Sequence, residues 1–192
     1  IDVIQPEKIE FKQNSYEDGE NSIISFPEFL LLVLDVCTGG EQPASHYQPD
    51  KLIEKFDALK TYFTAGEFYE KMLYYRLLLD YYTIRRDIKD GQGNYSLILK
   101  GPKDDSDKLK QYQSMLYVST EAFYNWLKPY LRKLEQDELH SCAEMLAFLK
   151  KEDNERHSIL PARKDLSYKA SGNIRYWFWR LDYYLWEQRS TF

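Results

Sequence analysis

Residues 64–86 read TAGEFYEKMLYYRLLLDYYTIRR, and this stretch decides the fold. Five of its apolar residues recur at helical spacing and therefore share one face of a helix: Phe68, Met72, Tyr75, Leu79 and Tyr82. Four more cover much of the remaining surface: Leu73, Leu77, Leu78 and Ile84. A helix that is apolar nearly all round is usually buried. We therefore predict that this stretch is the central helix of an all-helical domain and ends near Asp87.

Polar residues mark the beginning and the interior of this helix. Thr64 is followed three residues later by Glu67, which is the spacing of a capping box. Arg76 and Asp80 lie one turn apart among apolar residues. Because an unpaired charge in a protein interior is very costly, we expect these two residues to form a structural ion pair.

The flanking sequence continues the helical pattern. Six further helices are predicted to begin near Ser25, Pro49, Asp105, Thr120, Asp137 and Ser171. The first is predicted to start with a Ser25–Glu28 capping box, and the helix from Asp105 is predicted to place Leu109, Tyr112, Met115 and Leu116 inside. Residues 95–99, YSLIL, are compatible with one short extended segment, and residues 151–170 are polar and read as a loop. We predict an acidic arm or leading segment at 1–22 and a helical domain at 23–192. The fold class is all-α, an irregular bundle of about seven helices.

Composition limits the class of protein. The chain has 192 residues, enough for one domain with a core, and 16% are aromatic, so many buried rings will carry hydroxyls that need hydrogen-bond partners. The net charge of −5 is not that of a dedicated nucleic-acid binder. The charge is uneven, however: residues 1–36 hold eight acidic and two basic residues, whereas residues 150–192 hold nine basic and six acidic ones. A basic C-terminal part could meet phosphate locally.

Cysteine usage and hydropathy indicate a cytoplasmic location. Cys37 and Cys142 lie in apolar helical patterns, so we expect reduced thiols, with a disulfide between them as the alternative. The longest apolar run, Phe29–Leu34, is too short to span a bilayer, and there is no signal peptide. The sequence begins at Ile1 rather than Met, and we interpret it as a piece of a longer chain.

The last predicted helix, NIRYWFWRLDYYLWEQ at 173–188, has two apolar faces. The first consists of Ile174, Trp177, Phe178, Leu181 and Leu185. The second consists of Trp179, Tyr183 and Trp186. Since one helix at the end of a domain rarely buries two aromatic faces, we expect the second face to dock on a part of the protein outside this sequence.

Two short motifs are similar to known signatures but lack their functional residues. Asp90-Gly91-Gln92 begins like the Asp-Gly-Gln-Gln-Arg signature of ParB-like nucleotide-binding domains, but the next residues are glycine and asparagine, so we interpret it as a turn. Residues 155–161, ERHSILP, are similar to the Glu-His-Ile-x-Pro core of HNH nucleases.

In the second motif an arginine separates the glutamate from His157, and the other histidines, His46 and His140, are not at metal-ligand spacing. We predict an exposed loop histidine there, and solvated rather than catalytic acids at Glu152, Asp153 and Glu155. No catalytic residue, metal site or cofactor site is predicted within this sequence.

Basic residues interleaved with aromatic ones suggest one possible contact with DNA. They are Arg163, Lys164, Lys169, Arg175 and Arg180, and the neighbouring rings are Tyr168, Tyr176 and Trp179. Such a set can bind a nucleic-acid strand through charge and stacking. The alternative is that the aromatic residues, which recur at helical spacing, belong to the core and the charges to a solvated face.

Several stretches, taken in order, resemble one family. They are 26–31 (FPEFLL), 51–56 (KLIEKF), 76–82 (RLLLDYY) with 85–86 (RR), 113–118 (QSMLYV), 174–177 (IRYW) and 180–183 (RLDY). In their order and spacing they resemble the helical region of GmrSD-type restriction proteins, and the resemblance covers roughly residues 23–190. Those proteins join an N-terminal ParB-like domain, which uses nucleotide in DNA restriction, to a C-terminal HNH nuclease domain.

The resemblance implies a helical connecting domain of an antiviral DNA-restriction protein, without a catalytic site or cofactor of its own. Its partners would be the flanking ParB-like and HNH domains of the same chain, with DNA as a further possibility and no membrane. The alternative is a DNA-contacting module that uses the basic C-terminal third. A third hypothesis, a small enzyme, requires a polar pocket that contains Arg76, Asp80 and a histidine.

Overall fold

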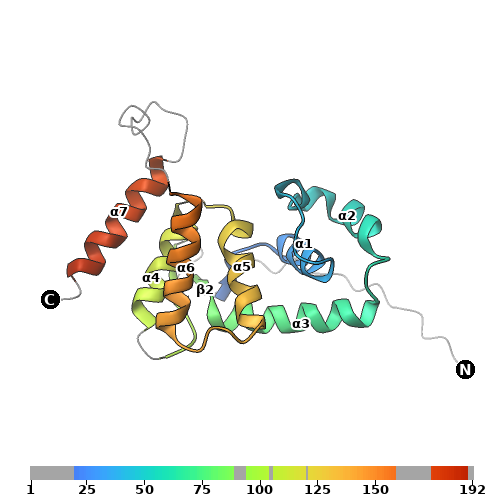
Figure 1. The fold of residues 1–192 in the computed structure, drawn as a ribbon, viewed down its shortest axis with the longest axis horizontal. Helices are drawn as coiled ribbons and strands as arrows, with labels where there is room; N and C mark the ends of the chain where they lie inside the picture. The colour runs from blue at the N-terminus through green and yellow to red at the C-terminus, as the bar shows by residue number, and fades with distance from the viewer. Residues whose placement is uncertain (1–19, 89–93, 104–105, 120, 159–173, 190–192) are drawn as a thin grey trace, which may run out of the picture.

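The structure, a computed structural model, describes residues 20–88, 94–103, 106–119, 121–158 and 174–189 (Figure 1). Within these ranges it contains seven α-helices: α1 (Phe26–Cys37), α2 (Leu52–Leu59), α3 (Ala65–Tyr82), α4 (Ser106–Val118), α5 (Phe123–Glu135), α6 (Cys142–Arg156) and α7 (Ile174–Arg189). Two short 3-10 turns, η1 (Ala44–His46) and η2 (Pro49–Lys51), precede α2. The predicted fold class, a mostly helical multi-helix domain, is confirmed.

The helices pack in a chain of neighbours. The contacts run from α2 to α1, from α1 to α3, from α3 to α5, from α5 to α6, from α6 to α4 and from α4 to α7. As a result α2 and α7 lie at opposite ends of the molecule (Figure 1). The hydrophobic core is continuous along this path, from Phe29 in α1 to Tyr183 in α7.

The most deeply buried helix is α1. Ser25 and Glu28 form a capping box at its start, as predicted, and the four consecutive residues from Leu31 to Leu34 are fully buried. The helix lies between α2 and α3. A run of four apolar residues can be buried on every side only when neighbours cover the helix all round, and α1 has that position.

The prediction that α3 is buried nearly all round is wrong. The helix and its Thr64–Glu67 capping box form as predicted, but among its residues only Phe68, Tyr75, Leu78 and Leu79 are buried. Leu73 is 63% exposed and Leu77 is 68% exposed. The reason is that α1 and α5 cover one side of α3 and leave the opposite side open to solvent.

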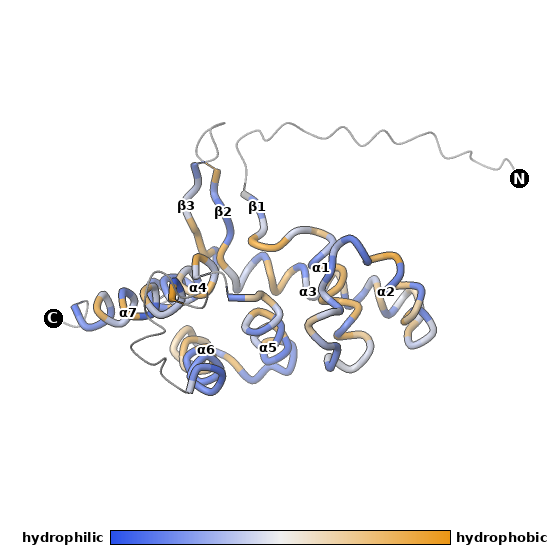
Figure 2. Tube along the Cα trace, turned by 90° about the horizontal axis from the view of Figure 1, so that it is seen from above, coloured by the Kyte–Doolittle hydropathy of each residue, from blue (hydrophilic) through white to orange (hydrophobic). Residues whose placement is uncertain are grey.

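A small antiparallel sheet projects beside the helices (Figure 2). Its strands are β1 (Glu20–Ser22), β2 (Ile84–Ile88) and β3 (Tyr95–Leu99), and their order is β1-β2-β3. The register places Asn21 and Leu97 on either side of Arg86. The expected extended segment at 95–99 is therefore a strand.

Strand β2 was not predicted, because the central helix was expected to continue to Asp87. The helix ends at Tyr82 instead, and the side chain of Gln113 in α4 forms hydrogen bonds with the backbone on both sides of this boundary. The Gln113 amide donates to the Tyr82 carbonyl at 3.0 Å, and its oxygen accepts from the Ile84 N–H at 2.9 Å. A side chain distant in sequence thus ends the helix and begins the strand.

The boundaries of α6 also differ from those predicted. Ser141, which forms a capping box with Glu144, caps this helix, whereas Asp137 has a φ of 55° and belongs to a turn. The helix continues to Arg156, so the first part of the predicted loop at 151–170 is helical. Residues 159–170 of that loop and the motif at 90–92 lie outside the described residues.

No disulfide joins Cys37 to Cys142, so the alternative of a bridge between them is wrong. Burial raises the pKa of Cys37, which favours its thiol form. Among the described residues, no helix combines the length and the apolarity that crossing a bilayer requires.

Candidate functional site

A buried acid, Asp153, lies where α4, α6 and α7 meet. Its carboxylate accepts a hydrogen bond from the Tyr112 hydroxyl at 2.6 Å and another from the Tyr176 hydroxyl at 2.8 Å. Burial and the charge of Asp153 raise the pKa of both tyrosines well above the ordinary range. Both hydroxyls therefore remain donors. The prediction that Asp153 is solvated is wrong.

Basic side chains surround this carboxylate at slightly longer distances. Arg180 Nη1 lies 3.8 Å, His157 Nε2 3.9 Å and Arg156 Nη2 4.0 Å from the nearer Asp153 oxygen. Glu121 adds a second acid, 3.5 Å from His157 Nε2. We call these five residues, with the two tyrosines, the Asp153 cluster. Because its charges face one another in the interior, the arrangement suits the fixing of helices rather than acid–base chemistry on a substrate.

His157 is not the exposed loop histidine that was predicted. It caps the C-terminus of α6, and its ring stacks on Tyr176 with centroids 4.1 Å apart. Within the described ranges, no group of three or more histidine, cysteine, aspartate or glutamate side chains is placed to hold a metal ion. The likeness of 155–161 to the HNH core therefore has no counterpart in the geometry of the described residues.

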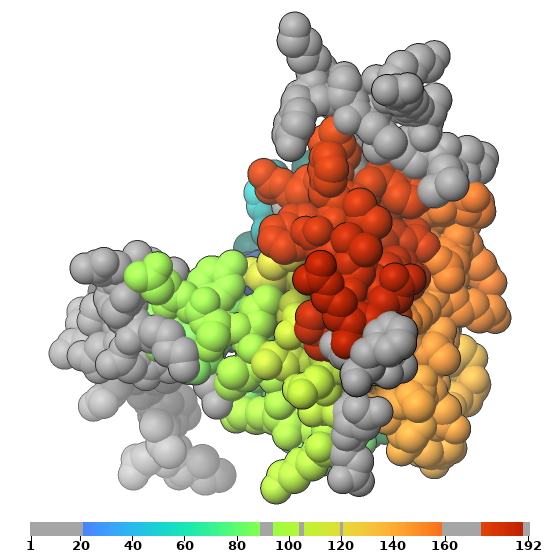
Figure 3. Space-filling view, turned by 90° about the vertical axis from the view of Figure 1, so that its left-hand side faces the viewer, coloured from blue at the N-terminus to red at the C-terminus, as the bar shows by residue number. Residues whose placement is uncertain are grey.

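Helix α7 lies across α4 and α6, as Figure 3 shows in red against green and orange. It packs through a row with polar tips, Tyr176, Arg180, Tyr183 and Glu187. Arg180 donates to Asn154 of α6, and Glu187 accepts from Lys150 at 2.6 Å. These partners lie one turn apart on α6, so the two helices are joined by a ladder of hydrogen bonds.

The assignment of the two faces of α7 was wrong. Of the face expected to pack, Phe178, Leu181 and Leu185 are exposed, and Tyr183 from the face expected to dock elsewhere is buried. Trp177 of the first face and Trp186 of the second are partly buried and pack against the core, so the core-facing side of α7 takes residues from both predicted faces. Trp179, from the second face, is 43% exposed and lines a cavity beside α4.

A pocket of about 470 Å³ lies between the end of α6 and α7, beside the Asp153 cluster. We call it the α6–α7 pocket, and its lining is Asn154, His157, Ser158, Trp177, Arg180, Leu181 and Tyr184. The guanidinium carbon of Arg180 is 5.3 Å from the centroid of the Trp177 ring and 5.8 Å from that of Tyr184. These distances are those of cation–π contacts, which hold both rings in place.

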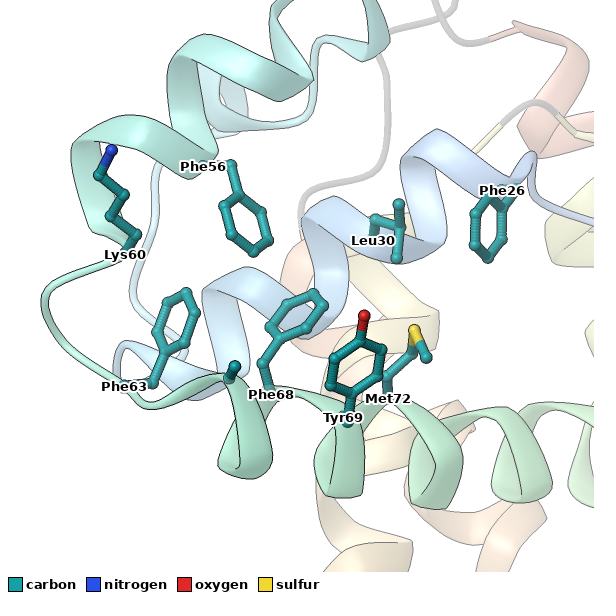
Figure 4. Close-up of a pocket in the computed structure, with 9 residues that line it drawn as sticks. Phe26, Leu30, Phe56, Lys60, Phe63, Phe68, Tyr69 and Met72 are labelled. Carbon is teal, nitrogen blue, oxygen red and sulfur yellow. The ribbon is translucent and has the colours of Figure 1, made fainter. Parts of the chain in front are cut away.

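A second pocket, of about 580 Å³, is an apolar groove formed by α1, α2 and α3 (Figure 4). Its lining is Phe26, Leu30, Phe56, Lys60, Phe63, Ala65, Phe68, Tyr69 and Met72. The rings of Phe56, Phe63 and Phe68 contact one another with centroids 5.0–5.7 Å apart. Lys60 pairs with Asp57 at 2.9 Å, and in Figure 4 its amine points away from the rings. The groove therefore suits apolar side chains.

The groove continues into an exposed apolar row along α3. The row consists of Tyr69, Leu73, Leu77 and Tyr81, which follow one another at intervals of four residues. Tyr69 belongs to both the row and the groove. Contiguous apolar surface of this kind marks interaction sites in soluble proteins. The sequence revealed these residues as apolar, but it assigned Leu73 and Leu77 to the core.

The predicted ion pair on α3 is present but lies at the surface. Arg76 Nε donates to Asp80 Oδ2 at 2.8 Å, and both side chains are partly exposed. The second cation beside Asp80 is Arg85, whose Nη1 lies 3.7 Å from the other carboxylate oxygen. It is not the histidine that the small-enzyme hypothesis requires.

Two of the five residues predicted to contact DNA lie in the described part of the chain, and their environments differ. Arg175 is exposed on α7. The Arg180 side chain is only 12% exposed and is engaged with Tyr176, Asn154 and Asp153, so it is not presented to a phosphate backbone. The other three, Arg163, Lys164 and Lys169, lie outside the described residues.

No protein-family model, curated protein or solved structure matches this chain. The geometry of these surfaces is therefore the basis for assigning a function.

Proposed function

We propose that this chain is a helical connecting domain that binds a partner domain at each of two apolar surfaces. One observation carries the proposal: the exposed row on α3 and the exposed residues of α7 lie on two helices that α5, α6 and α4 separate along the chain of packed helices (Figure 1). A domain whose apolar surface is divided in this way can hold two neighbours at a fixed separation.

The energy available at the α3 surface is sufficient for specific docking. Leu73 and Leu77 are each about two-thirds exposed, and full burial of a leucine stabilises a complex by about 1.5–3 kcal/mol. Tyrosines such as Tyr69 and Tyr81 are among the residues that most often dominate interfaces. Side chains at intervals of four residues form a ridge that fits the groove of a facing helix.

The resemblance to GmrSD-type restriction proteins suggests which domains these are. A ParB-like domain and an HNH nuclease domain of the same chain would occupy the two surfaces, and they would supply the nucleotide and metal chemistry of DNA restriction. The described residues of this chain would then contribute geometry, namely the distance and orientation between the two working domains. On this proposal the chain serves in defence against foreign DNA without catalysing a step itself.

The test is binding between this chain and each of the two partner domains, produced separately and measured by calorimetry. Leu73→Glu should weaken one complex at least tenfold, and Leu185→Glu should weaken the other, because each places a charge in an apolar interface. Lys151→Glu, at a side chain of α6 that is 70% exposed, is the control and should change neither. Equal affinities for all three variants would refute the proposal.

A nuclease assay examines the same proposal independently. The chain alone, incubated with duplex DNA and Mg²⁺ or Mn²⁺, should leave the DNA intact. Robust cleavage that survives repurification and disappears on substitution of a described residue would show that the chemistry resides in this domain.

A DNA-contacting module is the second candidate function. The observation that favours it is the exposure of Arg175 at the start of α7, close in sequence to Lys169. Binding to duplex DNA should then weaken steeply with salt and should be lost on Arg175→Glu and Lys169→Glu. Absence of binding at low salt would eliminate this candidate.

A further inference from the structure

The α6–α7 pocket combines aromatic walls with hydrogen-bonding groups. Trp177 and Tyr184 are only partly buried and line the pocket, so part of each ring faces the cavity. The contact with Arg180, and the His157 ring, whose centroid lies 5.9 Å from that of Trp177 in an edge-to-face arrangement, hold the tryptophan in place. A fixed, partly exposed indole is a surface on which a planar ring can stack.

Polar groups stand at the rim of the same cavity. Asn154 and Ser158 are both exposed and line the pocket. Asn154 Oδ1 accepts from Arg180, and its amide group has two donors. The Ser158 hydroxyl both donates and accepts. A ligand with donors and acceptors along the edge of a flat ring would find complementary groups here.

Size and charge narrow the class of ligand. A volume of about 470 Å³ lies within the range of small-molecule sites, roughly 300–1,000 Å³. The cations next to the pocket, Arg156 and Arg180, already face Asp153, so the pocket itself does not concentrate free positive charge.

We propose that the α6–α7 pocket binds the base of a nucleotide, which stacks on Trp177 and forms hydrogen bonds with Asn154 and Ser158. The site uses the flank of α7 next to α6 and shares Leu181 with the exposed residues of α7 named above. Trp177→Ala therefore tests the site without altering those exposed residues. The nucleotide can be a free mononucleotide or a unit of a single strand, because both present the same planar base.

The experiment measures binding of two probes to the purified chain at low salt: thymidine monophosphate and a fluorescein-labelled oligomer of twelve thymidines. Trp177→Ala should weaken binding about tenfold or more, as removal of one stacking aromatic residue typically does. Trp177→Phe, which keeps a ring, should lose much less. Trp179→Ala is the matched control, because Trp179 is also partly exposed on α7 but lines the cavity on the α4 side.

Leu181→Trp provides a second variant that leaves the core intact, since Leu181 is 53% exposed and lines the pocket. The larger side chain should fill the cavity and block binding, and this variant decides the matter if Trp177→Ala does not fold. Binding of the oligomer alone would identify a strand as the ligand, and binding of both probes would include the free nucleotide. Failure of both probes to bind, or equal weakening by Trp177→Ala and Trp179→Ala, would overturn the proposal.

Discussion

Removal of the Asp153 carboxylate should strongly destabilise the fold. Asp153→Ala leaves two fully buried tyrosine hydroxyls, Tyr112 and Tyr176, without their acceptor, and each such loss costs about 1–3 kcal/mol. It also removes the negative charge next to Arg180 and Arg156, and loss of one partner of a buried ion pair costs about 3–5 kcal/mol. These effects overlap, so we expect about 3–5 kcal/mol in total.

Thermal unfolding followed by circular dichroism measures this loss. For a chain of this length, 1 kcal/mol corresponds to about 2–4 °C, so the midpoint should fall by about 6–20 °C. Asp153→Asn keeps the shape of the side chain and one acceptor oxygen, so its unfolding midpoint should lie between those of the wild type and Asp153→Ala. Glu155→Ala, an exposed residue of the same helix, should change stability by less than about 0.5 kcal/mol. A midpoint for Asp153→Ala within about 2 °C of that control would refute the reasoning.

Three further predictions concern the N-terminal half. Thr64→Ala removes the cap of α3 and should cost about 1 kcal/mol in urea unfolding, whereas Thr61→Ala, an exposed neighbour, should cost little. Burial lowers the pKa of His46 below 6.5, more than its hydrogen bond to a backbone carbonyl raises it, so the folded state favours the neutral ring. The associated stability is fully present above about pH 6.5 and is lost as the pH falls through the lowered pKa. On acidification from pH 7, the thermal unfolding midpoint should therefore drop more in the wild type than in His46→Gln. Gly40 has a φ of +80°, and Gly40→Ala should cost about 1–2 kcal/mol, which parallel denaturation curves would reveal.

Local signals in the sequence were sufficient for much of the fold. The capping boxes at Ser25 and Thr64 form as predicted, because both partners of each box lie within four residues of one another. The predicted core face of α4 is also buried, since its apolar residues repeat along a single stripe and neighbours cover only that stripe: Leu109, Tyr112, Met115 and Leu116. Such features depend on the segment itself.

Features that depend on distant residues could not be predicted. The end of α3 is set by Gln113, some thirty residues later, which contacts both sides of the boundary. The exposure of Leu73 and Leu77 is equally non-local, because an apolar residue shows that burial would be favourable but not whether a neighbour is available. A helix that is apolar on all sides therefore has two explanations: other elements of the same domain surround it, or one of its sides binds a partner outside the domain.

The acid–tyrosine contacts of the Asp153 cluster recur elsewhere in this protein. Three carboxylates accept hydrogen bonds from tyrosines on other elements: Asp153 from Tyr112, Glu135 from Tyr75, and Asp35 from Tyr47. Burial and the adjacent carboxylate raise the pKa of each tyrosine, so each hydroxyl keeps its proton and remains a hydrogen-bond donor over the whole physiological range.

A phenol donor also explains why these sites escaped detection in the sequence. A tyrosine at helical spacing indicates an aromatic core, and an acid in a polar stretch indicates solvent, so neither residue by itself predicts that the two will meet. In α7 the same chemistry turns Tyr176 and Arg180 toward the buried acid on α6. Because these two residues occupy the inward side of the helix, Phe178, Leu181 and Leu185 lie on the outward surface that the proposed connecting role requires.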